Sequence, residues 1–265
     1  MTLIRTPVSL KVPARIAAIF WATKLLTTAF GESTSDFLVH NVNPYLAVIA
    51  GFIVFAIAMV LQLRTDRYVP WVYWLAVAMV AVFGTMAADV LHVEFRVPYI
   101  ASTVLFAVLL VAVFWTWSRM EPTLSIHSIS TTRRELFYWA AVLATFAMGT
   151  ALGDLVAYTL NLGFLTAGIV FAVLFALPGV AYYTGRVGAI PAFWAAYVMT
   201  RPLGASFADW TGKSRDAGGI GIGDGTMAFI LGALIVAAVA YLTVSRSDQP
   251  LGDHEARPAL AEEAL

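Results

Sequence analysis

Eight apolar segments, each about as long as a membrane-spanning helix, follow one another along this chain. They cover approximately residues 16–38, 43–63, 70–92, 97–118, 134–158, 163–184, 190–210 and 224–244. A helix that crosses the hydrocarbon core of a bilayer needs roughly 20 predominantly apolar residues. Of the 265 residues, 60% are hydrophobic and 12% are charged, whereas soluble domains carry roughly 25% charged residues. The sequence therefore predicts an all-α membrane protein with eight transmembrane helices.

Several other classes of protein are excluded by the same sequence. The formal net charge is zero, which argues against a nucleic-acid-binding protein. The chain has no cysteine, so disulfides and thiolate metal sites are excluded. It contains no P-loop, no HExxH motif and no Ser–His–Asp pattern. We therefore expect no enzymatic activity and no covalently attached cofactor.

Lysine and arginine residues are distributed unequally between the two sets of loops. Eleven belong to the side that carries both termini: Arg5, Lys11, Arg15, Arg64, Arg67, Arg119, Arg133, Arg134, Arg186, Arg246 and Arg257. Three belong to the opposite side: Arg96, Lys213 and Arg215. Because cytoplasmic loops are enriched in Lys and Arg, we expect both termini to be cytoplasmic. The expected location is a bacterial inner membrane, with residues 246–265 as a disordered cytoplasmic tail.

A pattern of Trp, Gly and Asp recurs four times with the spacing W-x9-G-x4-D. The copies are Trp21, Gly31 and Asp36; Trp74, Gly84 and Asp89; Trp139, Gly149 and Asp154; and Trp194, Gly204 and Asp209. Each copy lies on an odd-numbered segment and is followed by an apolar even-numbered segment. The repeating unit is therefore a helix hairpin, with copies at about 12–65, 66–125, 130–187 and 188–245. Since each unit crosses the membrane twice, all four copies enter from the same side and are parallel.

Parallel repeats of this kind are related by an axis along the membrane normal. We expect one transmembrane domain over residues 1–245, in which four equivalent odd-numbered helices surround a pseudo-four-fold axis. The repeated glycine favours close packing of neighbouring helices; the alternative is that it lets the helix bend or exposes a carbonyl to a ligand. The repeated tryptophan is interpreted as an anchor at the membrane interface.

The repeated aspartates are expected at one common depth in the outer half of the bilayer. A carboxylate costs roughly 2.5–3.5 kcal/mol at the centre of a spanning helix, so four at equivalent positions require a shared explanation. One interpretation is helix capping or pairing with loop amides near the outer interface. The other is a convergent acidic site, formed by Asp36, Asp89, Asp154 and Asp209, that binds a cation or carries protons.

Three further charged residues favour the acidic site. Glu32 and Asp36 share a helix face, and two carboxylates that close need a cation or a basic partner to remain ionised. Lys24 and Arg201 lie within spanning segments, too far along their helices to pair with the aspartate of their own repeat. We expect each of them to have a carboxylate partner on another helix and to act as a counter-charge. A site with oxygen ligands only suits Mg²⁺, Mn²⁺ or Ca²⁺ better than Zn²⁺ or Cu⁺.

The four repeats also resemble a known family. The most distinctive stretches are Gly149-Thr-Ala-Leu-Gly-Asp154 and Thr200-Arg-Pro-Leu-Gly204. Together with the W-x9-G-x4-D pattern, they resemble a bacterial family of four-repeat integral membrane proteins of unknown function, described as uncharacterised membrane-anchored proteins. The resemblance covers residues 12–244 approximately, and it implies the four-repeat architecture without implying an activity.

Our leading hypothesis from the sequence is a transporter of a divalent cation, with manganese or a similar hard ion as the substrate. The four aspartates would be the metal ligands, Glu32 would add to the ion-binding site, and Lys24 and Arg201 would compete for the carboxylates. Two alternatives are a proton-coupled carrier of a small solute and a membrane scaffold or sensory partner without transport activity. The expected partners are membrane lipids and a divalent cation or proton; an oligomer is compatible with the sequence.

Overall fold

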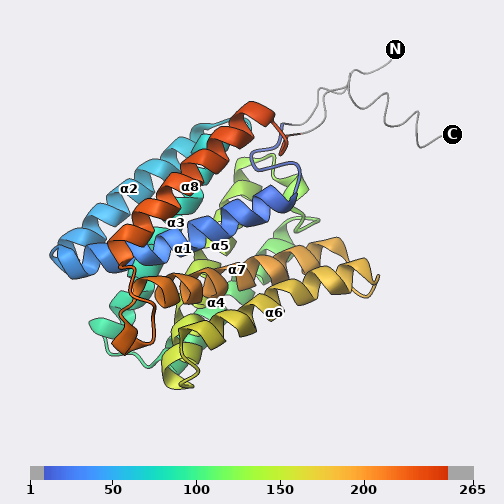
Figure 1. The fold of residues 1–265 in the computed structure, drawn as a ribbon. Helices are drawn as coiled ribbons and strands as arrows, with labels where there is room; N and C mark the ends of the chain where they lie inside the picture. The colour runs from blue at the N-terminus through green and yellow to red at the C-terminus, as the bar shows by residue number, and fades with distance from the viewer. Residues whose placement is uncertain (1–8, 250–265) are drawn as a thin grey trace, which may run out of the picture.

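Eight long helices joined by short connections make up the computed structural model, which describes residues 9–249 (Figure 1). They are α1 (Ala18–Asn41), α2 (Pro44–Arg64), α3 (Pro70–Val93), α4 (Tyr99–Met120), α5 (Thr132–Asp154), α6 (Phe164–Tyr183), α7 (Ala189–Gly212) and α8 (Asp224–Ser245). A π-helical turn, η2 (Leu155–Thr159), extends α5, and short 3₁₀ helices lie at η1 (Ile126–Ser128) and η3 (Arg215–Ala217). Each long helix coincides with one apolar segment of the sequence.

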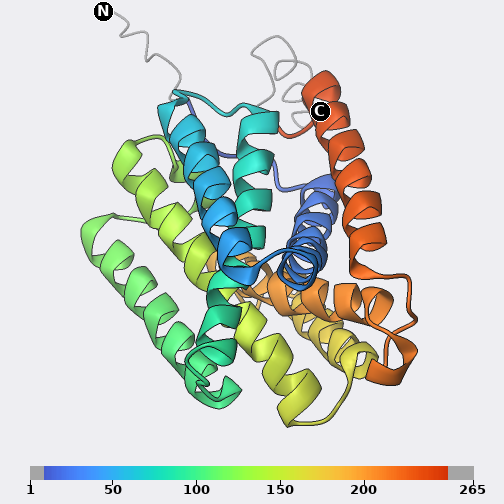
Figure 2. The ribbon, with the colours of Figure 1, turned by 90° about the vertical axis from the view of Figure 1, so that its left-hand side faces the viewer.

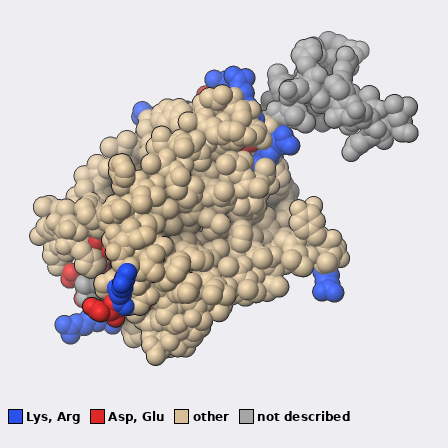
Figure 3. Space-filling view, in the orientation of Figure 1, with Lys and Arg blue, Asp and Glu red and all other residues tan. Residues whose placement is uncertain are grey.

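Six of these helices, α2 to α6 and α8, are long and apolar enough to cross a membrane. The other two, α1 and α7, are each 24 residues long, and each carries a basic residue in its interior and an aspartate near its C-terminal end. Figure 3 shows a face of the molecule whose middle is almost free of charged residues, while Lys, Arg, Asp and Glu gather at its ends. The chain is therefore an all-α, multi-pass membrane protein.

The four odd-numbered helices form a closed ring. Helix α1 packs against α3, α3 against α5, α5 against α7, and α7 against α1. At each contact a repeated glycine faces the neighbouring helix. If the glycine carried a Cβ atom, that atom would collide with a residue of the neighbour: Ala81 for Gly31, Phe146 for Gly84, Arg201 for Gly149 and Thr28 for Gly204. In every case the contacted residue lies three positions before the repeated glycine of its own helix, which is the next odd-numbered helix of the ring. The same close contact thus recurs around a pseudo-four-fold axis, as expected for small residues at helix interfaces.

The even-numbered helices form an outer layer around this ring. Helix α2 packs against α3, α4 against α5, α6 against α7, and α8 against α1; in Figure 2, α4 (green) and α8 (red) lie on opposite outer sides. The two helices of one repeat make few contacts with each other. Each repeat therefore places its second helix on the first helix of the next repeat, which interlocks the four units.

The repeated tryptophans lie mainly in the core, so their expected role as interface anchors is wrong. Trp74, Trp139 and Trp194 are at most 6% exposed, and Trp21 is partly buried against the same aromatic cluster. They belong to odd-numbered helices, which neighbours surround on most sides. A large aromatic ring therefore finds partners in the bundle, as in the edge-to-face contact of Trp194 with Tyr197.

The segments that flank the helical bundle meet at one end of it. The backbone N–H of Ala14 donates to the carbonyl oxygen of Asp248 at 2.9 Å, and the Tyr68 hydroxyl donates to the Asp248 carboxylate. Residues 246–249, which the sequence assigned to a disordered tail, are therefore packed against the N-terminal segment. The remainder of that predicted tail, residues 250–265, lies outside the described residues.

Candidate functional site

The repeated aspartates lie near the C-terminal ends of the four odd-numbered helices, at one end of the ring. Asp36, Asp89, Asp154 and Asp209 occupy equivalent positions, each five residues after the repeated glycine of its helix. Because parallel repeats place equivalent positions at the same level, the ring brings side chains from four helices into one acidic layer. This layer is the candidate site.

Three carboxylates of this layer form a compact trio. Glu32, Asp36 and Asp209 each offer one carboxylate oxygen, and these oxygens all lie within 4.8 Å of one another. Glu32 and Asp209 are buried and Asp36 is partly buried. Oxygen clusters of this kind are the ligands that Mg²⁺, Mn²⁺ and Ca²⁺ take in proteins. Asp89 and Asp154, which the sequence also nominated as ligands, are not part of the trio.

Lys213, the first residue after α7, inserts its ammonium group among the carboxylates. Its Nζ atom lies 2.5 Å from Asp36 Oδ2, 3.6 Å from Asp224 Oδ2 and 3.9 Å from Asp209 Oδ1. Burial disfavours the charged form of Lys213, but the three carboxylates together raise its pKa above the usual range for lysine. Lys213 therefore carries a positive charge where a bound cation would lie.

Sequence reasoning placed Lys213 in a loop and did not include Lys213 or Asp224 in the site. One signal was available, since Lys213 follows Asp209 by four residues and so shares its helix face. The partnership with Asp224 has no such local signal, because Asp224 begins the next helix. It depends on how the connecting loop folds back.

That loop, residues 213–223, caps the C-terminus of α7. Backbone N–H groups of Ile220, Ile222 and Gly223 donate to the carbonyl oxygens of Trp210, Thr211 and Gly212, respectively. Carbonyls in the last turn of a helix lack partners within the helix, so the loop satisfies them. Positive φ angles at Gly218, Gly221 and Gly223 allow the tight path. The glycine-rich stretch therefore holds Lys213 against the acidic layer.

Arg201 lies next to the acidic layer, inside the ring, and is completely buried. Its Nη2 atom, which bears two N–H bonds, lies within hydrogen-bond distance of three acceptors: Glu32 Oε2 at 2.5 Å, Thr85 Oγ1 at 2.5 Å and Thr150 Oγ1 at 2.8 Å. Each of these three acceptors directly follows the repeated glycine of its helix. The guanidinium group of Arg201, which belongs to the fourth repeat, thus contacts equivalent positions in the first three repeats. Glu32 is the carboxylate partner on another helix that the sequence led us to expect for Arg201.

Among residues 9–249, Lys24 has no carboxylate partner, so within the described structure the corresponding expectation for this residue is wrong. Its side chain is buried, and Nζ makes no hydrogen bond to any described residue. The ammonium lies 4.0 Å from the ring centroid of Phe146 and 4.3 Å from that of Tyr197. Glu32 is eight residues further along α1, or about 12 Å, and is already paired with Arg201.

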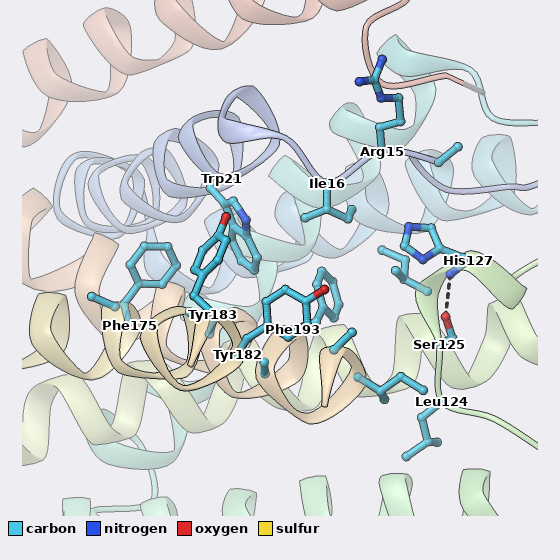
Figure 4. A pocket seen from close by; sticks show the side chains of 18 residues that line it. Arg15, Ile16, Trp21, Leu124, Ser125, His127, Phe175, Tyr182, Tyr183 and Phe193 are labelled. Carbon is cyan, nitrogen blue, oxygen red and sulfur yellow. Dashed lines mark hydrogen bonds between the residues drawn. The ribbon is translucent and has the colours of Figure 1, made fainter. Parts of the chain in front are cut away.

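A cavity of about 500 Å³ lies at the opposite end of the bundle. It is bounded by the start of α1, the residues around η1, the end of α6 and the start of α7. Figure 4 shows Trp21 and Phe175 on one side of it and Arg15 and His127 on the other. None of the described residues that line it is an aspartate or a glutamate. The cavity is therefore separate from the acidic layer.

Comparison with known proteins agrees with the four-repeat architecture. A family model described as Repeat of Unknown Function (DUF347) matches residues 19–68, 72–123, 137–186 and 192–248. No curated protein and no solved structure matches the chain. Each matched segment pairs one odd-numbered helix with the even-numbered helix that follows it. Since the four matches together cover most of the sequence, the chain belongs to the DUF347 repeat family.

Proposed function

We propose that this protein transports a hard divalent cation, with Mn²⁺ as the best candidate, and binds it at Glu32, Asp36 and Asp209. The observation that carries the proposal is the trio of carboxylate oxygens within 4.8 Å of one another. Small side-chain rotations bring such oxygens to the roughly 2.0–2.6 Å that hard cations require. When ionised, Asp89 and Asp154 would add negative charge from the other two odd-numbered helices and so favour cation binding.

In this proposal Lys213 acts as a tethered counter-ion that the metal displaces. Its ammonium already contacts Asp36, Asp209 and Asp224, so a divalent ion and Lys213 compete for the same oxygens. The side chains of Lys213 and Asp224 are 19% and 21% exposed. An ion would therefore reach the trio from the side of the 213–223 loop.

Arg201 and Lys24 lie on the other side of the trio, within the ring. Fixed positive charges lining a path oppose the passage of cations. In the described arrangement, the carboxylate trio would therefore be accessible from the side of the 213–223 loop and closed toward the opposite side of the membrane. Transport then requires a second state in which Arg201 leaves Glu32, and the bound ion would favour that state by replacing Arg201 as the partner of the carboxylate.

We further propose that the acidic layer faces the outside of a bacterial inner membrane and that both termini are cytoplasmic. The support is the distribution of basic residues. Three segments meet at the end of the bundle opposite the acidic layer: those around Lys11 and Arg67 and the residues that follow α8. Cytoplasmic loops carry the excess of Lys and Arg, which assigns that end to the cytoplasm.

Uptake of Mn²⁺ into proteoliposomes tests the proposed transport. With a Mn²⁺-quenched dye inside the vesicles, the wild-type protein should give saturable quenching. Asp36→Asn and Asp209→Asn should each weaken the apparent affinity by about tenfold or more, since one ligand charge is lost and tenfold corresponds to about 1.4 kcal/mol.

Two exposed carboxylates outside the acidic layer provide matched controls. Asp66→Asn and Asp216→Asn remove the same charge and should leave Mn²⁺ uptake unchanged. Uptake no faster than in protein-free vesicles, or equal uptake by all four variants and the wild type, would contradict the proposal.

A further inference from the structure

The buried layer next to the acidic site contains a lysine that has no carboxylate partner among the described residues. Lys24 and Arg201 are at most 1% exposed. Glu32 pairs with Arg201, whereas Lys24 forms no ion pair with any described residue. An isolated ammonium away from water carries a large desolvation cost unless something compensates its charge.

Several hydrogen-bond donors in this layer have no acceptor. They are Lys24 Nζ, Arg201 Nε, Arg201 Nη1 and the hydroxyl of Thr145, all of them buried and without a partner among the described residues. Leaving a buried donor unsatisfied is unfavourable, and more so when the group is charged. Buried polar groups in folded proteins nearly always have a partner, so this set of donors indicates a missing acceptor.

The two cations lie around one aromatic ring. Lys24 Nζ is 4.0 Å from the centroid of Phe146, and Arg201 Cζ is 5.6 Å from the same centroid. Thr145 directly precedes Phe146 on α5. The donors are therefore contributed by three adjacent helices of the ring, α1, α5 and α7.

The pseudo-four-fold arrangement shows how unusual Lys24 is at its position. It lies seven residues before the repeated glycine of α1, and the equivalent residues of the other repeats are Val77, Val142 and Tyr197. All three are fully buried. One repeat thus supplies a cation where the other three supply uncharged side chains that fill the surrounding space.

We propose that a small monovalent anion of the halide class binds between Lys24 and Arg201, beside the ring of Phe146. The anion accepts hydrogen bonds from Lys24 Nζ and from the free N–H groups of Arg201. A single negative charge would balance the charge of a protonated Lys24. A small ion suits a place between two side chains that are both buried. This site uses none of the carboxylates of the divalent-cation trio, although its Arg201 is paired with Glu32 of that trio.

Chloride-35 NMR on the purified protein in detergent, without divalent metals, tests the proposal. Binding to a protein broadens the chloride resonance, so the wild type should give excess broadening. This excess should saturate as the sites fill with chloride, and bromide should reduce it by competing for the same sites. Lys24→Met should reduce the excess broadening to the level of protein-free detergent. Arg186→Met, which removes a positive charge from an exposed loop, should keep the wild-type broadening.

Two further measurements separate loss of the site from loss of folding. Lys24→Arg keeps the positive charge and should retain competition by bromide. A bromide-soaked crystal should show an anomalous peak within hydrogen-bond distance of Lys24 Nζ. Equal chloride broadening by the wild type and Lys24→Met would overturn the proposal. A bromide-soaked crystal without an anomalous peak at this place would overturn it as well.

Discussion

The guanidinium group of Arg201 on α7 lies 2.5 Å from the carboxylate of Glu32 on α1. This ion pair connects the last repeat to the first and therefore closes the ring of odd-numbered helices. The same nitrogen also contacts Thr85 on α3 and Thr150 on α5. One side chain thus makes polar contacts with all three other helices of the ring.

Removal of either partner of this pair is expected to destabilise the protein. Arg201→Met leaves Glu32 buried without its cation, and losing one partner of a buried pair typically costs about 3–5 kcal/mol. Leu234→Ala, at a side chain that is 47% exposed on α8, should cost much less. Thermal unfolding in detergent measures both. The double variant Arg201→Met/Glu32→Gln should recover part of the loss; equal stability of Arg201→Met and Leu234→Ala would show that the pair contributes nothing.

The repeated glycines are expected to be intolerant of even a methyl group. A Cβ on Gly149 would lie 2.5 Å from Arg201 Cγ, whereas a Cβ on Gly179 in α6 would meet no atom within 4 Å. Gly149→Ala should therefore cost about 1–3 kcal/mol through overpacking, and Gly179→Ala should be neutral or stabilising by about 0.4–1 kcal/mol. Unfolding by denaturant compares the two. The packing argument is wrong if both changes have the same sign and size.

Lys213→Met is expected to strengthen the binding of Mn²⁺, because it removes the ammonium that competes for Asp36 and Asp209. The gain should be about tenfold or more in affinity, measured by electron paramagnetic resonance of free Mn²⁺ in a titration. Arg215→Gln removes an exposed positive charge from the same loop and serves as the control. Weaker binding by Lys213→Met than by Arg215→Gln would mean that Lys213 supports the site instead of competing for it.

The connection between α4 and α5 is expected to lose stability in acid. Arg134 and Arg133 donate to Glu121 at 2.7 and 2.6 Å, and these hydrogen bonds lower the pKa of Glu121. A carboxyl group whose pKa is lower in the folded state stabilises that state at pH values above its unfolded-state pKa of about 4.3. This stabilisation is lost as the pH falls through the folded-state pKa. The stability difference between wild type and Glu121→Gln should thus be present at pH 7 and shrink below about pH 4. A difference that is independent of pH would exclude the ion pairs as its cause.

The orientation in the membrane can be checked with a reporter that is active only in the cytoplasm. Fusions after residue 65, 125, 187 or 246 should be active, because basic residues concentrate on that side. Fusions near residue 41, 95, 161 or 217 should be inactive. The reverse pattern would place the acidic layer in the cytoplasm and would overturn the proposed direction of access.

The sequence by itself determined the architecture of this protein. Eight apolar segments of spanning length predict eight helices, and the W-x9-G-x4-D pattern predicts four parallel repeats. Both signals are local, since a helix needs only its own residues to satisfy its backbone hydrogen bonds within a membrane. The repeated glycine also indicated close helix packing, because removal of a side chain acts directly on the adjacent helix.

Only the tertiary structure decided which charged groups meet. Spacing along a helix fixes the level of a side chain but leaves open which neighbour it faces. Closure of the ring brings α1 beside α7, so Glu32 contacts Arg201 across 169 positions of sequence, and the folded loop adds Lys213 and Asp224 to the acidic layer. Lys24 stays without a carboxylate partner in the part of the chain that the structure describes, since the nearest acidic residue along α1, Glu32, is already held by Arg201. These pairings depend on helix rotation and on the order of neighbours in the ring, which no local pattern encodes.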